Sequence, residues 1–409
     1  MKQVWILNHY AQEPGGVGGT RHFSLAKHLR ALGWQTTVIA ASLELNTGRQ
    51  RLASHEKTRL DAFESVHFLW IKTPPYKGNG AGRMLNMLVY ALRVCLPSAT
   101  HQLPRPDVVV GSSVHPFAAI SGAWLAKRHG ALFVFEVRDL WPQTLVDLGR
   151  LKDSGLLTYL SRWVEFWLYR RADKIVVLLP KAVDYIAPLG IAADKVVWIP
   201  NGVELDGYDK PSLPAIRNQF TLMYFGAHGQ ANGLGCILGA MVELSKRPNM
   251  KHVRLRLIGD GPLKSALMAQ ASQLNLRTVI FEDPVPKAKI PQLASEADAF
   301  VICVKDLPQL YRYGVSMNKL FDYLAASRPI IMASAAANDP VQDAGAGFTV
   351  KPENPFQLAE AIDKLVKLSP AQRAAMGEAG RAYVERHHSF SALASKFAKI
   401  FEQLDEKVG

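Results

Sequence analysis

The sequence has little cysteine and no long hydrophobic run. Its three cysteines, Cys95, Cys236 and Cys303, stand far apart without a CxxC pair, which excludes a disulfide framework and a cysteine zinc site. A reducing compartment is therefore expected. The longest apolar stretch, 84–96, is interrupted by polar residues and is shorter than the ~20 residues of a transmembrane helix. The first ten residues, MKQVWILNHY, lack a signal-peptide cleavage pattern and are predicted to form a strand. The sequence thus predicts a chain that does not span a membrane.

The composition is that of a folded enzyme of more than one domain. A hydrophobic fraction of 48% and a charged fraction of 20% exclude a disordered, collagen-like or coiled-coil chain. A length of 409 residues exceeds what one compact core usually holds, so two or three domains are expected.

Positive charge is in excess and is unevenly spread. The 48 Lys and Arg against 35 Asp and Glu give a formal net charge of +13. Residues 1–200 hold 24 of the basic and 14 of the acidic residues, whereas the remainder holds 24 and 21. The first half is therefore expected to meet an anionic partner, which could be nucleic acid, an anionic membrane surface or a phosphorylated substrate.

Apolar runs rich in β-branched residues alternate with helical segments, which is typical of parallel sheets buried on both faces. One series runs from VWILN to KIVVLLP and a second from LMYFG to PIIMA. Turn residues at 200–202 separate them. We predict an α/β protein with two Rossmann-like, doubly wound parallel-sheet domains, 1–202 and 203–386. A C-terminal helix, 387–409, is expected to cross back to the first domain.

Glycine-rich segments follow the first strand of each series. The loop 13–21 holds Gly16, Gly18 and Gly19 followed by Arg21, which suits a phosphate or sugar at a helix N-terminus. It is not a dinucleotide fingerprint, because arginine stands where the last glycine would fall. A flexible turn before a helix is the alternative. In the second series the loops 225–233 and 257–262 supply further candidate donor contacts: His228, Asn232, Gly233 and Asp260.

Polar residues also follow two strands of the first series. His115 ends GSSVHP, and Glu136, Arg138 and Asp139 end the apolar strand FEV. Charges at such a position are costly unless they pair or bind something, so these four residues are catalytic candidates. A surface histidine and a structural ion pair are the alternatives.

The segment 311–326 predicts a phosphate-binding helix. Ser316 is expected to be its N-cap, with Lys319 in the first turn and Asp322 one turn later on the same face. A helix N-terminus with a lysine can hold a diphosphate, and the carboxylate can accept ribose hydroxyls. A surface ion pair is the alternative. The candidate donor contacts from this segment are Arg312, Ser316, Asn318, Lys319, Leu320 and Asp322.

Taken together, these segments resemble the family-4 retaining glycosyltransferases of the GT-B fold along nearly the whole chain. The bacterial subgroup that adds N-acetyl-fucosamine-type sugars to surface polysaccharide precursors is the most similar. The matching segments are PGGVGGTRH, GSSVHPF, FEVRDLWP, IPNGVE, YFGAHGQANGL, LIGDGP and YGVSMNKLFDYLAASRPII. The resemblance implies two domains facing a cleft, with the acceptor on the first and a nucleotide sugar on the second.

The resemblance also implies roles for individual residues, and at some positions this sequence departs from the family pattern. Asp322 matches the second of two spaced family acids, which holds the ribose, whereas the first falls on Gly314. The diphosphate-gripping Arg and Lys of the family fall on Ala227 and Asn232, so Lys319 and Arg312 are expected to replace their charge. A family histidine of the catalytic region matches Arg138 or a neighbour. The base would lie near 283–287, at Val285. The family needs no metal, and no Asp-x-Asp motif or other cofactor signature appears.

The resulting hypothesis is a metal-independent hexosyl- or N-acetylhexosaminyltransferase. It would move a sugar from a UDP-sugar to a lipid-diphosphate-linked or polysaccharide-precursor acceptor of O-antigen, lipopolysaccharide or capsule synthesis. The expected place is the cytoplasmic face of a bacterial plasma membrane, where the run 82–96 would lie in the anionic interface. A buried core helix is the alternative for this run. Nucleic acid is excluded, because no aromatic-interleaved basic patch is present. The alternatives are a UDP-sugar 2-epimerase and a non-catalytic nucleotide-sugar binding protein.

Overall fold

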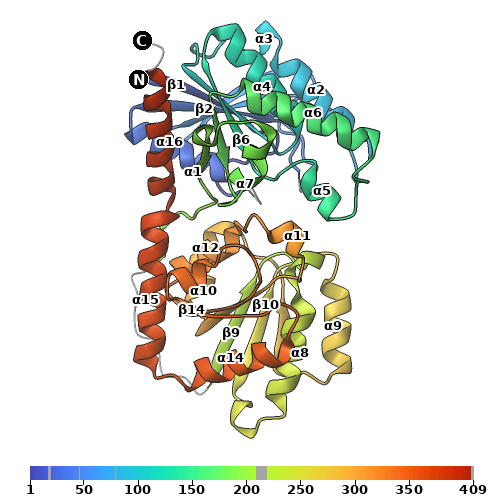
Figure 1. Ribbon diagram of the computed structural model, residues 1–409, viewed down its shortest axis with the longest axis vertical. Coiled ribbons are helices and arrows are strands. Elements are labelled where there is room, and N and C mark those ends of the chain that lie inside the picture. Colours follow the sequence, from blue (N-terminus) through green and yellow to red (C-terminus); the bar gives the residue numbers. More distant parts are fainter. Residues whose placement is uncertain (17–19, 46, 79, 209–218, 407–409) are drawn as a thin grey trace. The chain divides into compact units, whose positions relative to one another are not determined.

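The computed structural model describes residues 1–16, 20–45, 47–78, 80–208 and 219–406. The chain divides into two compact units (Figure 1). Unit 1 comprises Met1–Pro200 and Phe390–Gly409, and unit 2 comprises Asn201–Ser389. Each unit is built on one sheet whose central strands are buried, apolar and rich in β-branched residues, whereas strands at the sheet edges are only partly buried. The prediction of two α/β parallel-sheet domains is confirmed.

Unit 1 has an eight-stranded sheet in the order β3-β4-β2-β1-β5-β6-β7-β8. All neighbours are parallel except β3 and β4, an antiparallel edge hairpin that the sequence did not predict. The strands are β1 Lys2–Leu7, β2 Trp34–Ala41, β3 Thr58–Phe63, β4 Val66–Ile71, β5 Val108–Ser112, β6 Leu132–Val137, β7 Lys174–Val177 and β8 Val196–Trp198. The helices are α1 Arg21–Ala31, α2 Ala81–Val94, α3 Pro97–Thr100, α4 Pro116–His129, α5 Gln143–Asp147, α6 Leu156–Arg171, α7 Val183–Ile186 and α16 Phe390–Asp405.

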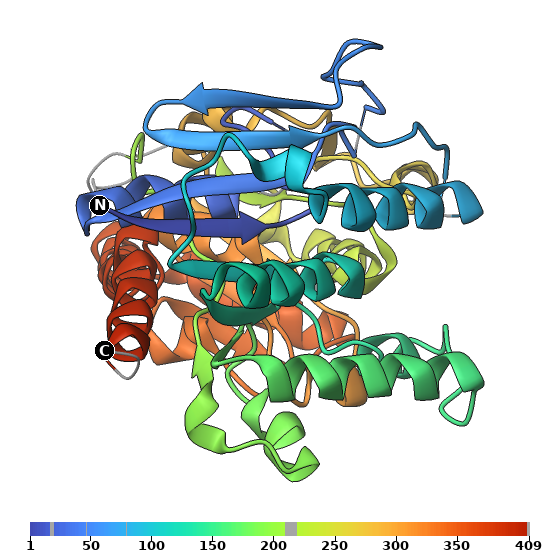
Figure 2. The same cartoon turned by 90° about the horizontal axis from the view of Figure 1, so that it is seen from above.

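Helices cover both faces of this sheet. Helices α1 and α16 pack on one face, where Leu25, Leu29 and Phe401 share a core with Val4 and Val110 of the strands. Helices α2, α4 and α6 lie side by side on the other face, as Figure 2 shows. Strand order changes direction at β1, so the loops after β1 and β5 meet at the topological switch point, where such sheets bind ligands.

Unit 2 has a six-stranded, fully parallel sheet in the order β11-β10-β9-β12-β13-β14. Its strands are β9 Phe220–Phe225, β10 Val253–Ile258, β11 Val279–Glu282, β12 Ala299–Cys303, β13 Ile330–Ala333 and β14 Gly347–Val350. Its helices are α8 Leu234–Ser245, α9 Lys264–Gln273, α10 Ile290–Ser295, α11 Pro308–Tyr311, α12 Asn318–Ala325, α13 Pro340–Asp343, α14 Pro355–Lys367 and α15 Pro370–His387.

Two separate cores lie on the two faces of the unit 2 sheet. Helices α8, α9 and α14 pack on the face that carries Leu222 and Val301. Helices α10, α12 and α15 pack on the face that carries Met223 and Phe300. Strand order changes direction between β9 and β12, so the loops that follow these two strands flank the switch point of unit 2.

Candidate functional site

In unit 2 the glycine-rich loop after β9 lies at this switch point. Its backbone touches the loop after β12, because the N–H of Lys305 donates to the carbonyl of Ala231 at 3.2 Å. Gly233 has a φ of 54° and ends the loop at the start of α8. A Cβ there would lie 3.2 Å from Cβ of Cys303, so both the backbone conformation and the space favour glycine. The loop is thus built for close approach.

Lys319 joins this loop to helix α12. It is the second residue of α12, and its Nζ donates to the Tyr224 hydroxyl at 2.7 Å and to Asn232 Oδ1 at 2.5 Å. Nζ also lies 4.5 Å from the centre of the Tyr224 ring. Burial lowers the pKa of Lys319 to about 7. An approaching anion would restore its full charge, so helix N-terminus and ammonium together suit a diphosphate.

His228 lies in the same loop, and both its backbone N–H and its backbone carbonyl are hydrogen-bonded. Its N–H donates to the Asp260 carbonyl at 2.8 Å, and its carbonyl accepts from Leu263 at 3.1 Å. The side chain is buried, and within the described residues neither ring nitrogen has a hydrogen-bond partner. Burial, with Lys264 nearby, lowers the pKa of His228, so the ring is neutral at pH 7. Asp260 is exposed and accepts from the N–H of Gly261.

The predicted helix start at Ser316 is wrong. Helix α12 begins at Asn318 with Met317 as its N-cap, and no side chain caps it. The Ser316 hydroxyl instead accepts from the N–H of Asn201 at 2.8 Å, and its carbonyl accepts from Asn201 Nδ2 at 2.8 Å. Because Ser316 is committed to Asn201, the N–H groups of the first turn of α12 have no side-chain cap.

Asp322 lies one turn deeper on α12 and is already paired. Lys287 Nζ contacts both carboxylate oxygens, at 2.5 and 2.7 Å, and the Tyr208 hydroxyl donates to Oδ1 at 2.9 Å. Lys319, the partner of Asp322 in the alternative of a surface ion pair, takes no part in this cluster. A ribose at Asp322 would therefore have to replace or join Lys287, whose side chain is 46% exposed.

The glycine at 314 has a structural cause. Gly314 is buried with a φ of 102°, a conformation that glycine adopts freely and that a glutamate would adopt only under strain. The first acid of the family pair could not stand here without rebuilding the turn between α11 and α12.

The other candidates of unit 2 differ in their surroundings. Arg312 stacks on the Tyr313 ring at 4.8 Å and donates to Gln309, so it joins a cluster other than that of Lys319. Asn318 is exposed at the first position of α12, and Val285 is half-buried between β11 and α10. Leu320 is fully buried in the core, so its side chain cannot touch a donor. The predicted donor contact of the Leu320 side chain is therefore wrong, and only the backbone of Leu320 could contact a donor.

In unit 1, Glu136 is the centre of a buried polar network and not an exposed catalytic group. It is 0% exposed and accepts from Arg21 Nε at 3.0 Å, from His22 Nε2 at 2.7 Å and from the Ser112 hydroxyl at 2.7 Å. Burial opposes ionisation, but His22 and Arg21 hold the pKa of Glu136 well below its usual value. Its carboxylate therefore neutralises Arg21 inside the domain.

Arg21 is likewise committed within unit 1. Besides Glu136, it donates to the carbonyls of Ile199, at 3.0 Å, and Pro200. It is 4% exposed, so the expected phosphate or sugar contact of Arg21 is wrong. This arginine ties α1 to the end of the unit instead.

Arg138 and Asp139 leave the sheet after β6. Arg138 is half-buried and its N–H donates to the Ser113 hydroxyl at 3.0 Å, whereas Asp139 is exposed. The expected triplet is therefore split: Glu136 belongs to the interior, and only the other two can reach a ligand. Both stay candidate catalytic residues.

His115 caps helix α4 next to a second histidine. Its Nδ1 accepts from the Ala118 N–H at 3.3 Å, and its ring centre lies 4.7 Å from that of His9. His9 Nε2 pairs with Asn86 Oδ1 at 2.7 Å. Burial lowers the pKa of His9 to about 3 and that of His115 well below 6.5, so both rings are neutral at pH 7. A neutral His115 could contact a hydroxyl but is mostly enclosed.

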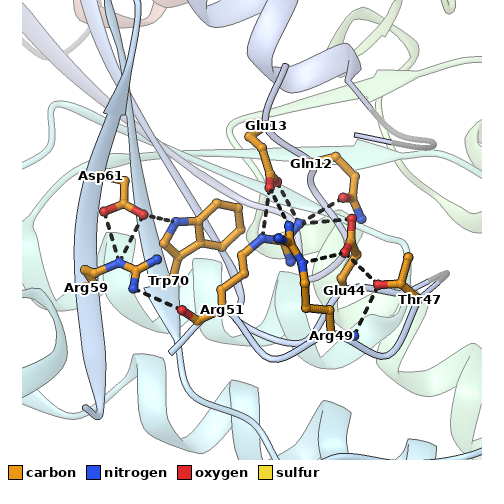
Figure 3. Close-up of polar contacts among 9 residues, drawn as sticks. All are labelled: Gln12, Glu13, Glu44, Thr47, Arg49, Arg51, Arg59, Asp61 and Trp70. Carbon is orange, nitrogen blue, oxygen red and sulfur yellow. Dashed lines mark hydrogen bonds and ion pairs between the residues drawn. The ribbon is translucent and has the colours of Figure 1, made fainter. Parts of the chain in front are cut away.

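The start of the first glycine-rich loop is held by a cluster that the sequence analysis missed (Figure 3). Arg51 donates to Glu13 at 2.6 Å and to Gln12 at 3.0 Å, and it lies 4.4 Å above the Trp70 ring. Gly16 donates to the Glu13 carbonyl, whereas Gly18 and Gly19 lie outside the described residues. Arg51 is thus a positioning residue for this loop.

The missed residues left only weak signals. His9 is the second residue after the first strand, in the loop from which such sheets contact ligands. Arg51 lies in none of the segments that the sequence patterns single out, and its partner Glu13 is 38 residues away.

No helix among the described residues is both long and apolar enough to cross a bilayer. No three His, Cys, Asp or Glu side chains gather as a metal group in that part of the chain.

Comparisons with known proteins agree with this two-part arrangement. Residues 16–202 match the family described as "Glycosyl transferase 4-like domain", and residues 219–367 match "Glycosyl transferases group 1". The chain is 23% identical over 316 residues to a probable glycosyltransferase, WbjE, of Pseudomonas aeruginosa, which covers 75% of this chain and 76% of that one.

Solved structures of similar fold span almost the whole chain. Sucrose-phosphate synthase of Thermosynechococcus elongatus has a TM-score of 0.74 at 16% identity and covers 100% of both chains. Anabaena HepE in complex with UDP and glucose has a TM-score of 0.67 at 16% identity, covering 98% of this chain and 99% of that one. WaaG, a glycosyltransferase involved in lipopolysaccharide biosynthesis, has a TM-score of 0.66 at 18% identity, covering 98% and 99%.

The fold and the two domain matches define the class. The chain carries the two domains of a glycosyltransferase with the GT-B fold, the first of the family-4 type and the second of group 1.

Proposed function

We propose that the protein is a retaining glycosyltransferase that moves an N-acetylated sugar from a UDP-sugar to a lipid-diphosphate-linked saccharide in surface polysaccharide synthesis. It would act at the cytoplasmic face of the plasma membrane. One observation carries the donor assignment: Lys319 stands in the first turn of α12 and is bonded to the glycine-rich loop through Asn232. The solved structure of HepE with UDP supports the choice of nucleotide.

In this reaction the bond between the sugar C1 and the diphosphate oxygen breaks, and a bond from C1 to an acceptor hydroxyl oxygen forms. The products are UDP and the new glycoside, and the hydroxyl proton is released. Negative charge grows on the leaving diphosphate, so a fixed cation and helix N-terminus lower the barrier. Lys319 and the first turn of α12 would provide both.

The other residues have supporting roles in the proposal. Asp322 would hold the ribose after exchange with Lys287, and the loops that hold His228 and Asp260 would border the sugar nucleotide. In unit 1, Arg138, Asp139 and His115 would contact the acceptor, whose hydroxyl must be held on one face of the sugar.

The test is product analysis with the purified protein and membranes that contain lipid-linked acceptors, over a panel of UDP-sugars. The expected result is sugar in the lipid fraction, UDP release that depends on the acceptor, and the donor anomeric configuration in the product. UDP with free sugar in the absence of acceptor would instead identify a 2-epimerase. UDP binding without turnover of any donor would identify a non-catalytic nucleotide-sugar binder.

A further inference from the structure

The outer surface of the α2, α4 and α6 layer is unusually apolar for a protein surface. Among the described residues, 22 large apolar side chains are exposed, and ten of them lie on these three helices of unit 1. Since α2 contacts α4 and α4 contacts α6, the three helices that carry these ten side chains form one continuous layer (Figure 2). Single exposed apolar residues are ordinary, but a gathered set marks an interaction surface.

Helix α6 contributes the most concentrated part of this surface. Leu156, Tyr159, Leu160 and Trp163 recur at helical spacing and are 49–74% exposed. The opposite stripe is fixed to the unit, because buried Glu165 accepts from the hydroxyls of Tyr169, at 2.8 Å, and Tyr185, at 2.9 Å. The apolar stripe therefore faces outward as part of the fold.

Helix α2 repeats the same division. Asn86, Tyr90 and Val94 are its buried residues, and the Tyr90 hydroxyl donates to the Ile39 carbonyl at 2.7 Å. Met84, Leu85, Leu88 and Leu92 are exposed. The run 82–96 is thus neither a buried core helix nor wholly exposed, since only one side of it packs on the unit.

The exposed charged residues of these three helices are all basic. The three helices carry seven Lys and Arg residues, including Arg162, Arg170 and Arg171, and one acidic residue, the buried Glu165. The loop before α6 adds Lys152 and Asp153, and Asp153 pairs with Arg162 at 2.5 Å. Leucine, tryptophan and tyrosine beside arginine are the residues that anchor helices in the interface of an anionic bilayer.

We infer that this layer is the membrane-docking surface of the protein, with α6 and α2 seated in the interface of a bilayer that contains anionic phospholipid. The inference rests on the proposed function only for the lipid-linked acceptor that makes docking useful. A second copy of the chain fits the surface less well, because a two-fold contact would set this cationic layer against itself without exposed acidic groups on the helices to pair with.

The test is sedimentation of the full-length protein with vesicles of phosphatidylethanolamine and phosphatidylglycerol, and with vesicles of phosphatidylcholine alone. We expect binding to the anionic vesicles. Leu156→Ser combined with Trp163→Ser should weaken it at least about tenfold, since both side chains insert. Met268→Ser with Phe356→Ser, a matched pair of exposed apolar residues in unit 2, should leave it unchanged.

The charge contribution has its own variant. Arg170→Gln with Arg171→Gln should weaken binding to anionic vesicles by about fivefold for each residue and leave binding to phosphatidylcholine unchanged. Equal effects of the unit 1 and unit 2 pairs, or no vesicle binding at all, would overturn the inference. So would a dimer in analytical ultracentrifugation that Trp163→Ser dissociates. Vesicle binding without any sugar transfer would contradict the proposed function but would still support this surface as the membrane-docking surface.

Discussion

The two units use the same edge of the same kind of sheet but treat their charges in opposite ways. In unit 1, Arg21 and Glu136 neutralise each other beside the strand ends, and neither is more than 4% exposed. In unit 2, Lys319 is held by two neutral partners, Tyr224 and Asn232. A paired buried charge serves the architecture, whereas a cation on neutral partners can still be matched by a ligand anion. The two units thus differ in whether a buried charge is already paired with an opposite charge or is still open to one.

The outer faces differ as well. Unit 1 gathers apolar and cationic side chains on α2, α4 and α6, whereas the described part of unit 2 has few exposed large apolar residues, such as Met268 and Phe356. Part of the excess positive charge in the first half of the sequence therefore lies on the surface of α2, α4 and α6, which suits an anionic bilayer.

The largest expected effect is on unit 1. Glu136→Ala leaves Arg21 buried without its counter-charge and should cost about 3–5 kcal/mol of unfolding free energy. All eight tryptophans lie in residues 1–200, so tryptophan fluorescence during urea unfolding follows unit 1 selectively.

The matched control for this change is Asp139→Ala, three residues along the same segment but exposed. It should alter the free energy of unfolding by no more than about 0.5 kcal/mol. Similar losses for the two variants would remove the distinction between interior and ligand-facing charges after β6.

The next effect sharpens the role of Asp322. Asp322→Asn should weaken UDP binding about tenfold, because a neutral amide accepts ribose hydroxyls less strongly than a carboxylate. Lys287→Ala should do the opposite and strengthen UDP binding a few-fold, since it frees the carboxylate without removing it. Calorimetric titration measures both. A loss of affinity in Lys287→Ala would mean that Lys287 itself binds the nucleotide.

The smallest effect is a pH dependence. Lys319 has a pKa of about 7 when free, and a bound diphosphate would raise that pKa, so binding takes up a proton above pH 7. Affinity for a UDP-sugar should therefore fall as pH rises from 7 to 8, by about fivefold. The conservative variant Lys319→Arg stays charged and should flatten this profile. A flat profile in the unaltered protein would show that Lys319 does not need its charge.

Local sequence patterns predicted most of the fold. The runs that became β1, β5, β6, β7, β9, β10 and β12 are apolar and β-branched, and their strand form depends on neighbours close in the chain. The hairpin β3–β4 was missed, because the edge strand Thr58–Phe63 has neither a continuous apolar run nor strict alternation, and the turn between the two strands contains no glycine. Short edge strands are stabilised by pairing more than by their own pattern.

The site was predicted less well, because its partners are distant in sequence. Glu136 meets Arg21 across 115 residues, and the Ser316 hydroxyl is taken by Asn201 across the same separation. Charge at a strand end predicts that a partner exists but does not identify it. The place of Lys319 in the first turn of a helix was predicted correctly, because such a position is a local property of the sequence.

The most direct test of the central claim is calorimetric titration of UDP into the full-length protein and its Lys319→Ala variant, with Lys289→Ala as the exposed-lysine control. We expect Lys319→Ala to weaken UDP binding by about 10- to 100-fold through the lost charged hydrogen bonds, and Lys289→Ala to bind UDP as the unaltered protein does. Equal UDP affinities for all three proteins would contradict it.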